Sequence, residues 1–328
     1  MFLGIEIGGT KLQLGIGPGD GTLAGLWRGT VDVAAGPEGI RRQITAAVPE
    51  LLAKAGLPIH DLKGVGIGFG GPVDDATRTV IKSHQIEGWD NFPLADWISD
   101  LVGLPTVLGN DADCAGLAET LFGAGKGLSP IFYITIGSGI GGGLIINGEI
   151  YRGCGRGAAE IGHLRIAHPL HKYLQQTGLG WAQGILEGLA SGWAIAGAPE
   201  AFSRYSADPS FSIPAGNKAF LTAQDVAGAA KNGNLLACAI LADAWDSLAD
   251  AIGHVVALLC PRRLIIGGGV SLMGEEILFG PLRAKVAERV FKPFADCYDI
   301  VPAALGEEVV VHGALALARK RLSGERLG

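Results

Sequence analysis

The chain has 328 residues, of which 48% are hydrophobic and 18% charged, and its formal net charge is −6. This length and composition predict one large or two medium globular domains, and the negative charge argues against a nucleic-acid partner, which would favour a basic face. No apolar run of about 18 residues occurs, so we expect no membrane span. Scattered cysteines without a Cys-x-x-Cys pair, and an N-terminus without signal-peptide features, favour a cytoplasmic protein.

Apolar runs with turn signals alternate with helical patterns along the chain, which predicts an α/β fold. The predicted strands cover residues 2–7, 12–17, 64–69, 105–109, 131–137, 143–147, 263–267 and 298–302. The predicted helices cover residues 37–55, 93–102, 112–122, 182–188, 222–231, 235–259, 273–290 and 312–321.

One pattern occurs twice. Residues 5–14 and 134–146 each read as a strand, a glycine-rich turn and a returning strand. This repeat predicts a duplicated α/β domain whose copies hold phosphate from two sides of a cleft, with coincidence as the alternative.

Several glycine clusters follow predicted strands. Residues 137–142 and 66–71 both match G-x-G-x-x-G, but a dinucleotide loop must open a helix. A strand follows the first match and a turn follows the second, so NAD binding is not expected. Bare backbone N–H groups at such turns instead suit phosphate. The candidate phosphate ligands are Gly8, Gly9, Thr10 and Lys11 in one turn, and Gly137, Ser138, Gly139 and Gly141 in the other.

Some of these residues have a simpler alternative. Lys11 could be a solvated strand residue, and Gly137–Gly143 could form a plain hairpin turn. Gly267, Gly268 and Gly269 lie between a strand and a helix, where they would let an adenosine lie against the helix start or would merely form a turn.

Polar residues that could carry chemistry lie at strand ends and in glycine-rich segments. Asp111 follows a strand and begins a helix, so it is either a general base for a hydroxyl or only a helix N-cap. Glu160 and His163 have i, i+3 spacing among glycines, which favours a loop that aims both side chains at a ligand over a surface pair. Gly71 could offer its backbone to a sugar. Trp89 could stack on that sugar or lie in the core.

These motifs together resemble the ROK family of repressors and sugar kinases. The resemblance rests on Gly8-Gly9-Thr10, Asn110-Asp111-Ala112, the glycine run 137–143 and Glu160-Ile161-Gly162-His163, and it covers residues 2–321. It implies a duplicated actin-like, hexokinase-type (ribonuclease H-like) fold with two lobes around a cleft. The expected lobes are residues 1–110 with 305–328, and residues 111–304.

The resemblance also implies roles for the candidate residues. Asp111 would be the catalytic base, and the sugar would be bound by Gly71, Asn110, Asp111, Glu160, His163 and Glu187. The two glycine turns would hold the phosphates of ATP, and Gly267–Gly269 would lie by the adenosine. Glu6 stands where the family usually has Asp, and it would reach Mg²⁺ through water.

The chain departs from the family in one segment. Relatives carry three zinc-binding cysteines before the last sugar-binding glutamate, and these positions fall here on Gly178, Gly180 and Ile185. None of these residues can ligate zinc, so structural zinc is not expected. A substitute site at His163, His168 and His171 is the weaker alternative, and the longer segment 163–187 puts the position of Glu187 in doubt.

The expected activity is ATP-dependent phosphorylation of a hexose, with glucose 6-phosphate as the product. The alternatives are a kinase of an N-acetylhexosamine or of fructose, a polyphosphate-dependent kinase and a non-catalytic sugar-sensing regulator. A regulator that binds DNA is disfavoured because the kinase-like motifs begin at residue 2 and the chain is acidic. Relatives are often dimers, so a homodimer is an open alternative.

Overall fold

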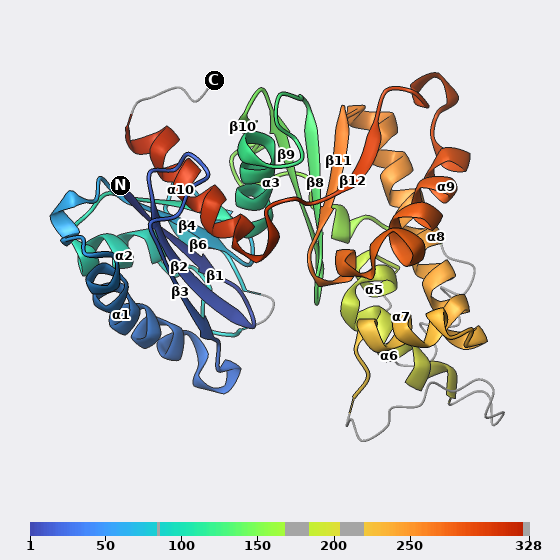
Figure 1. Cartoon of the computed structure of the whole chain (residues 1–328), viewed down its shortest axis with the longest axis horizontal. Helices are drawn as coiled ribbons and strands as arrows, with labels where there is room; N and C mark the ends of the chain where they lie inside the picture. Colours follow the sequence, from blue (N-terminus) through green and yellow to red (C-terminus); the bar gives the residue numbers. More distant parts are fainter. Residues whose placement is uncertain (84–85, 168–183, 204–219, 324–328) are drawn as a thin grey trace. The chain divides into compact units, whose positions relative to one another are not determined.

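The computed structural model describes residues 1–83, 86–167, 184–203 and 220–323 (Figure 1). The chain divides into two compact units. Unit 1 comprises Met1–Tyr133, Gly143–Ala159 and Ala303–Gly328, and unit 2 comprises Ile134–Gly142 and Glu160–Pro302. This division places residues 111–133 and 143–159 in unit 1, whereas the lobes predicted from the sequence change at residue 110.

Unit 1 contains a mixed five-stranded sheet with the order β3-β2-β1-β4-β7. Its strands are β1 (Phe2–Ile7), β2 (Lys11–Gly17), β3 (Gly25–Thr30), β4 (Val65–Phe69) and β7 (Thr106–Asn110). The first three strands form an antiparallel meander, and β4 and β7 run parallel to β1. The carboxyl ends of β1, β4 and β7 therefore meet at one edge of the sheet.

Helices cover both faces of this sheet. They are α1 (Gly36–Ala55), α2 (Leu94–Val102), α3 (Asp111–Phe122) and α10 (Val309–Leu322). Phe2 packs against Val311 and Leu315 of α10, whereas Leu3 belongs to the core cluster that includes Ile40 of α1. Because successive strand residues point to opposite faces, α1 and α10 lie on opposite sides of β1. A two-stranded sheet of β5 (Val73–Asp74) and β6 (Thr79–Val80) follows β4.

The second sheet has the order β10-β9-β8-β11-β12. Its strands are β8 (Ile131–Ile136), β9 (Ile140–Ile146), β10 (Glu149–Ile150), β11 (Arg263–Gly267) and β12 (Asp299–Pro302). As in the first sheet, the edge next to the hairpin is antiparallel (β10 with β9) and the other edge is parallel (β11 with β12). The matching order agrees with the duplication predicted from the repeated hairpin and confirms the α/β fold class.

Unit 2 contains the helices α5 (Glu187–Ala190), α6 (Gly192–Ser203), α7 (Ala223–Lys231), α8 (Leu235–Leu259) and α9 (Gly280–Arg289). The Asn234 side chain caps α8 by accepting a hydrogen bond from the Ala237 N–H (2.9 Å), and Cys260 ends it in a left-handed conformation. None of the described helices is long and apolar enough to cross a membrane.

The sequence prediction was wrong at several elements. It missed β3, β5, β6, β10 and α6, and the helix predicted at 182–188 begins only at Glu187 among the described residues. The helix predicted at 273–290 is a π-helical turn over Glu275–Phe279 followed by α9. Strand β9 begins at Ile140 and not at 143, so the glycines at 141–143 belong to the strand and not to the turn. A Cβ on Gly143 would lie 2.8 Å from the Ala112 carbonyl of α3.

Candidate active site

The candidate base lies at the edge of unit 1 where three parallel strands end. Register pairs Ile7 with Phe69 and Phe69 with Asn110, so β1, β4 and β7 end side by side. The Gly70 N–H donates to the Ile7 carbonyl (2.8 Å), which joins the segment after β4 to β1. Ligands of α/β sheets bind outside the carboxyl ends of strands, so this edge is the expected place for chemistry.

Asn110, and not Asp111, caps helix α3. The Asn110 Oδ1 accepts hydrogen bonds from the N–H groups of Ala112 (2.8 Å) and Asp113 (3.2 Å). The Asn110 Nδ2 donates to the Gly71 carbonyl (3.0 Å), so the amide joins the two segments that the resemblance assigns to the sugar. The alternative that Asp111 serves only as an N-cap is therefore wrong.

The Asp111 carboxylate lies in the first turn of α3. Its Oδ1 accepts from the Ala112 N–H (2.8 Å), and its Oδ2 would lie 3.5 Å from a Cβ placed on Gly70. The positive end of the helix dipole stabilises an anion at this position. The carboxylate is thus held beside the Gly70–Gly71 backbone, as a general base for a bound hydroxyl requires.

Glu6 is a buried carboxyl on β1, and its side chain pairs with Lys11 across the hairpin. The Lys11 Nζ lies 3.0 Å from Glu6 Oε1 and donates to the Glu307 carbonyl (3.0 Å). Burial raises the pKa of Glu6 from its ordinary value of 4.5 to about 7, and the Lys11 ammonium lowers it by a smaller amount. The carboxylates of Asp111 and Glu307 add to the rise. Lys11 is therefore an ion-pair partner and not only a solvated strand residue.

The same residues suit a magnesium ion. The Glu6 Oε2 is buried without a hydrogen-bond partner, and Asp111 lies close enough to raise the Glu6 pKa. Mg²⁺ prefers oxygen ligands and is usually held by one or two carboxylates together with substrate phosphates and water. A pair of carboxyls at the strand ends fits this requirement, and the described residues contain no cluster of three or more acidic, cysteine or histidine ligands.

The first predicted phosphate turn is a tight hairpin. The Gly8 N–H donates to the Lys11 carbonyl (3.0 Å), and the Thr10 carbonyl accepts from the Val31 N–H (3.0 Å). These bonds anchor the turn Gly8-Gly9-Thr10-Lys11 at both ends, at the same sheet edge as Asp111.

In unit 2, Glu160 and His163 lie one turn apart. A short 3₁₀ helix spans Ile161–His163, and the His163 N–H donates to the Glu160 carbonyl (3.1 Å). Residues i and i+3 of a 3₁₀ turn lie on the same side, so both exposed residues are presented together. Gly162 packs on the Ile140 carbonyl so closely that a Cβ would collide with it, which ties this turn to β9.

Glu187 lies against the second glycine turn. Its Oε2 accepts a hydrogen bond from the Ile140 N–H (2.8 Å), and a Cβ on Gly139 would collide with this carboxylate. The Gly137 N–H donates to Gly139, and the Gly137 carbonyl accepts from Gly192 (2.8 Å). The N–H groups of Gly137 and Ile140 in the predicted phosphate turn therefore donate to groups within unit 2. Glu187 and the Glu160–His163 segment both lie against this turn or the start of β9.

The third glycine cluster, Gly267–Gly269, also has a packing role. Gly268 has a φ of +84°, and a Cβ there would lie 2.6 Å from the Ile136 carbonyl of β8. The Gln224 side chain donates to the Gly269 carbonyl (2.9 Å). A 3₁₀ helix over Gly269–Met273 follows the turn.

Most of the residues that bear on zinc binding lie outside the part of the chain that the structure describes. Gly178, Gly180, His168 and His171 lie within the segment 168–183, which the structure does not describe. Ile185 is described, and it forms an isolated bridge with Arg165.

The structure settles one aromatic side chain that the sequence left open and adds one arginine that the sequence did not single out. Trp89 is fully buried, edge-on to the rings of Phe69 (5.4 Å) and Phe92 (5.3 Å), so it is a core residue. Arg152, which the sequence reading passed over, forms an ion pair with Asp113 (2.7 Å). No sequence signal marks this pair, since its members are far apart in the chain.

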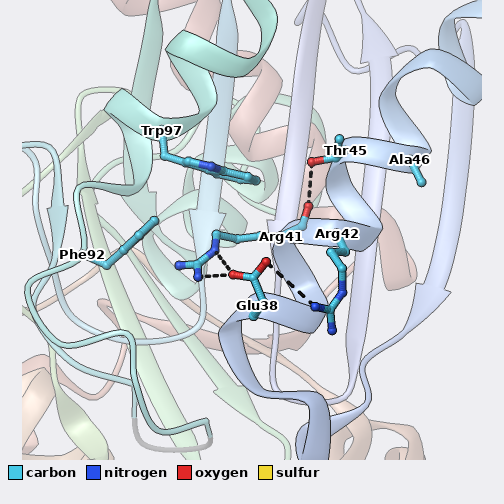
Figure 2. A pocket seen from close by; sticks show the side chains of 7 residues that line it. All are labelled: Glu38, Arg41, Arg42, Thr45, Ala46, Phe92 and Trp97. Carbon is cyan, nitrogen blue, oxygen red and sulfur yellow. Dashed lines mark hydrogen bonds and ion pairs between the residues drawn. The ribbon is translucent and has the colours of Figure 1, made fainter.

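A separate pocket of about 580 Å³ lies between α1 and the segment that leads into α2 (Figure 2). Its lining residues are Glu38, Arg41, Arg42, Thr45, Ala46, Phe92 and Trp97, and none of them is a predicted site residue. The Arg41 guanidinium lies over the Phe92 ring (4.7 Å to the centroid) and pairs with Glu38, as Figure 2 shows.

The fold and the site together define a two-unit α/β protein of the actin-like class. The model of the ROK family matches residues 2–321, and the chain belongs to this family. A glucokinase of Thermotoga maritima is 33% identical over 325 residues, with 98% of each chain covered.

Two solved structures show the same fold. A ROK family glucokinase from Streptomyces griseus, in complex with glucose and AMPPNP, is 30% identical, with a TM-score of 0.76 over 97% of this chain and 99% of that one. A ROK hexokinase from Thermus thermophilus is 26% identical, with a TM-score of 0.79 over 99% of each chain.

Proposed function

We propose that this ROK-family sugar kinase transfers the γ-phosphoryl group of ATP to the 6-hydroxyl of glucose. The observation that carries the proposal is the position of Asp111, beside the Gly70–Gly71 backbone and at the ends of three parallel strands. The similarity to glucokinases over nearly the whole chain favours glucose as the acceptor.

Asp111 acts as the general base in this proposal. Its carboxylate takes the proton of the sugar hydroxyl as the oxygen attacks the γ-phosphorus. The new O–P bond forms while the bond to the bridging oxygen of ADP breaks, so ADP leaves with that oxygen. The start of α3 favours the ionised base before the reaction, and proximity to Gly70 limits the positions that the carboxylate can take.

The sugar-binding roles are assigned residue by residue from the family resemblance. Asn110 and Gly71, which are already joined by a hydrogen bond, position the acceptor end of the sugar next to Asp111. Glu160, His163 and Glu187 are assigned to the remaining hydroxyls, because carboxylates accept and imidazole can donate or accept hydrogen bonds. The 3₁₀ turn supports this assignment by presenting Glu160 and His163 on one side.

ATP is assigned to the glycine turns. The phosphates are assigned to Gly8, Gly9, Thr10 and Lys11 and to the turn of Gly137, Ser138, Gly139 and Gly141, in which the Gly137 N–H is already bonded to the Gly139 carbonyl. Gly267, Gly268 and Gly269 are assigned to the adenosine. Glu6 would hold Mg²⁺ through water, and a bound ion would supply positive charge to the phosphates. The buried, unpartnered Oε2 of Glu6 supports this role.

A coupled ADP-release assay tests the proposal with glucose, N-acetylglucosamine, N-acetylmannosamine, mannose and fructose, and with ATP or polyphosphate as donor. We expect glucose with ATP to have the highest kcat/KM. Asp111→Asn keeps the shape of the side chain and should lower kcat by 10² to 10⁴, the usual contribution of a general base. No turnover of any sugar by the unaltered chain would instead favour the sugar-sensing alternative.

A further inference from the structure

Arg152 is a mostly buried arginine whose guanidinium reaches two separate segments of unit 1. It follows β10, and its side chain is 12% exposed. Its Nη1 lies 2.7 Å from Asp113 Oδ2, and its Nη2 donates to the Val73 carbonyl (2.9 Å). Its Nε faces Asp75 Oδ2 at 3.7 Å.

These two segments carry the groups proposed to bind and deprotonate the sugar. Val73 lies two residues after Gly71, and Asp113 lies two residues after Asp111 in the first turn of α3. The direct bond from Asn110 to the Gly71 carbonyl is one connection between the segments. Arg152 provides another connection, and it binds both segments with one planar group.

The energy of this connection depends on burial. The Asp113 side chain is 3% exposed, so the ion pair is shielded from water and from salt. Removing one member of a buried pair leaves an uncompensated charge, which is a large perturbation. A lysine cannot replace the arginine, because it lacks the planar fork that reaches two acceptors at once.

We infer that Arg152 is a positioning residue for the sugar site, which holds the Gly71 loop in register with Asp111. The inference rests on the proposed kinase function and adds a residue to it. Loss of the fork would let the loop and the helix start shift relative to each other. A displacement of about 1 Å at a reacting centre can lower the rate by about 10²-fold.

Arg156 provides a matched control. It lies four residues further along the same segment and faces the same β5 turn, with its Nε 3.9 Å from Asp74 Oδ2. Its side chain is 76% exposed, so its ion pair is weak and screened. Arg156→Ala therefore removes the same chemical group near the same loop without removing the buried connection.

The experiment compares Arg152→Ala, Arg152→Lys and Arg156→Ala in the ADP-release assay, with glucose and ATP varied separately. For Arg152→Ala we expect kcat/KM for glucose to fall at least tenfold while KM for ATP changes less than twofold. Arg152→Lys should not restore the rate, millimolar methylguanidine should partly rescue Arg152→Ala, and Arg156→Ala should match the unaltered chain. Equal kinetics of Arg152→Ala and Arg156→Ala would overturn the inference, as would an equal rise in KM for glucose and ATP.

A second variant covers the case in which Arg152→Ala does not fold. Arg152→Met with Asp113→Asn removes both buried charges together, so no charge is left unpaired, and it should show the same selective defect for glucose. If the unaltered chain phosphorylates no sugar, the proposed function fails, and calorimetric glucose binding still tests Arg152 through the same variants. An unaltered chain that neither phosphorylates nor binds a sugar would overturn both proposals.

Discussion

Glu6→Gln should change the pH dependence of stability. Glu6 is 4% exposed, one of its oxygens pairs with Lys11, and the other has no hydrogen-bond partner. Its pKa is raised to about 7 in the folded chain, chiefly by burial, against 4.5 for the ordinary side chain. The folded state therefore binds this proton more tightly than the unfolded state does.

The sign and size follow from linkage between protonation and folding. Since the folded-state pKa is the higher one, the carboxyl contributes stability below pH 4.5 and loses that contribution as the pH rises to about 7. A rise of about 2.5 pKa units corresponds to about 3 kcal/mol at 1.36 kcal/mol per unit. Most of this, about 2 to 3 kcal/mol, is lost between pH 5 and pH 8.

The assay is urea unfolding of the unaltered chain and of Glu6→Gln at several pH values from 5 to 8, without magnesium or nucleotide. Glutamine keeps the shape of the side chain but does not titrate in this range. We expect the free energy of unfolding of Glu6→Gln, relative to the unaltered chain, to increase by about 2 to 3 kcal/mol across this range. Glu87→Gln, which changes an exposed carboxyl in the same way, is the control for the loss of a surface charge.

A flat difference for Glu6→Gln would refute the reasoning, because it would mean that Glu6 keeps its ordinary pKa in the folded chain. An opposite slope would mean that the Lys11 ammonium outweighs burial.

Three further substitutions test local packing and backbone strain within the units. Gly162→Ala places a Cβ against the Ile140 carbonyl of β9, so KM for glucose should rise at least tenfold. Gly228→Ala, where a Cβ meets open space, should leave KM unchanged, and equal KM values would contradict the packing argument. Ala159 has a φ of +65°, which strains an alanine but not a glycine. In urea unfolding, Ala159→Gly should therefore lose up to about 1 kcal/mol less stability than the control Ala158→Gly, whose φ is not positive. Equal losses would exclude strain at Ala159. Trp89→Ala should lower the free energy of unfolding by about 3–5 kcal/mol, and a loss below about 1 kcal/mol would mean that this fully buried side chain does not support the core.

Local patterns were enough to predict much of the fold. The apolar pattern predicted α8 over its full length, and alternating apolar strands beside glycine turns predicted both hairpins. These features depend on neighbouring residues, so the sequence displays them directly. The edge strands β3 and β10 were missed because they bury little apolar surface and leave a weak pattern.

The candidate site was predicted as a set of residues but not as a set of contacts. Asp111, Glu160 and His163 were identified from spacing and family resemblance, and their roles in catalysis and sugar binding stay predictions. That Asn110 and not Asp111 caps α3 was not foreseen, since either residue type suits an N-cap.

The sequence by itself determined the hairpins, the long helices and the order of the polar motifs, because these depend on local spacing. Only the tertiary structure decided which groups meet: Glu6 with Lys11 and the Glu307 carbonyl, and Arg152 with Asp113 and Val73. The reason is that burial and partner choice arise when the sheet brings distant segments together. The raised pKa of Glu6 and the connection made by Arg152 exist only in that arrangement.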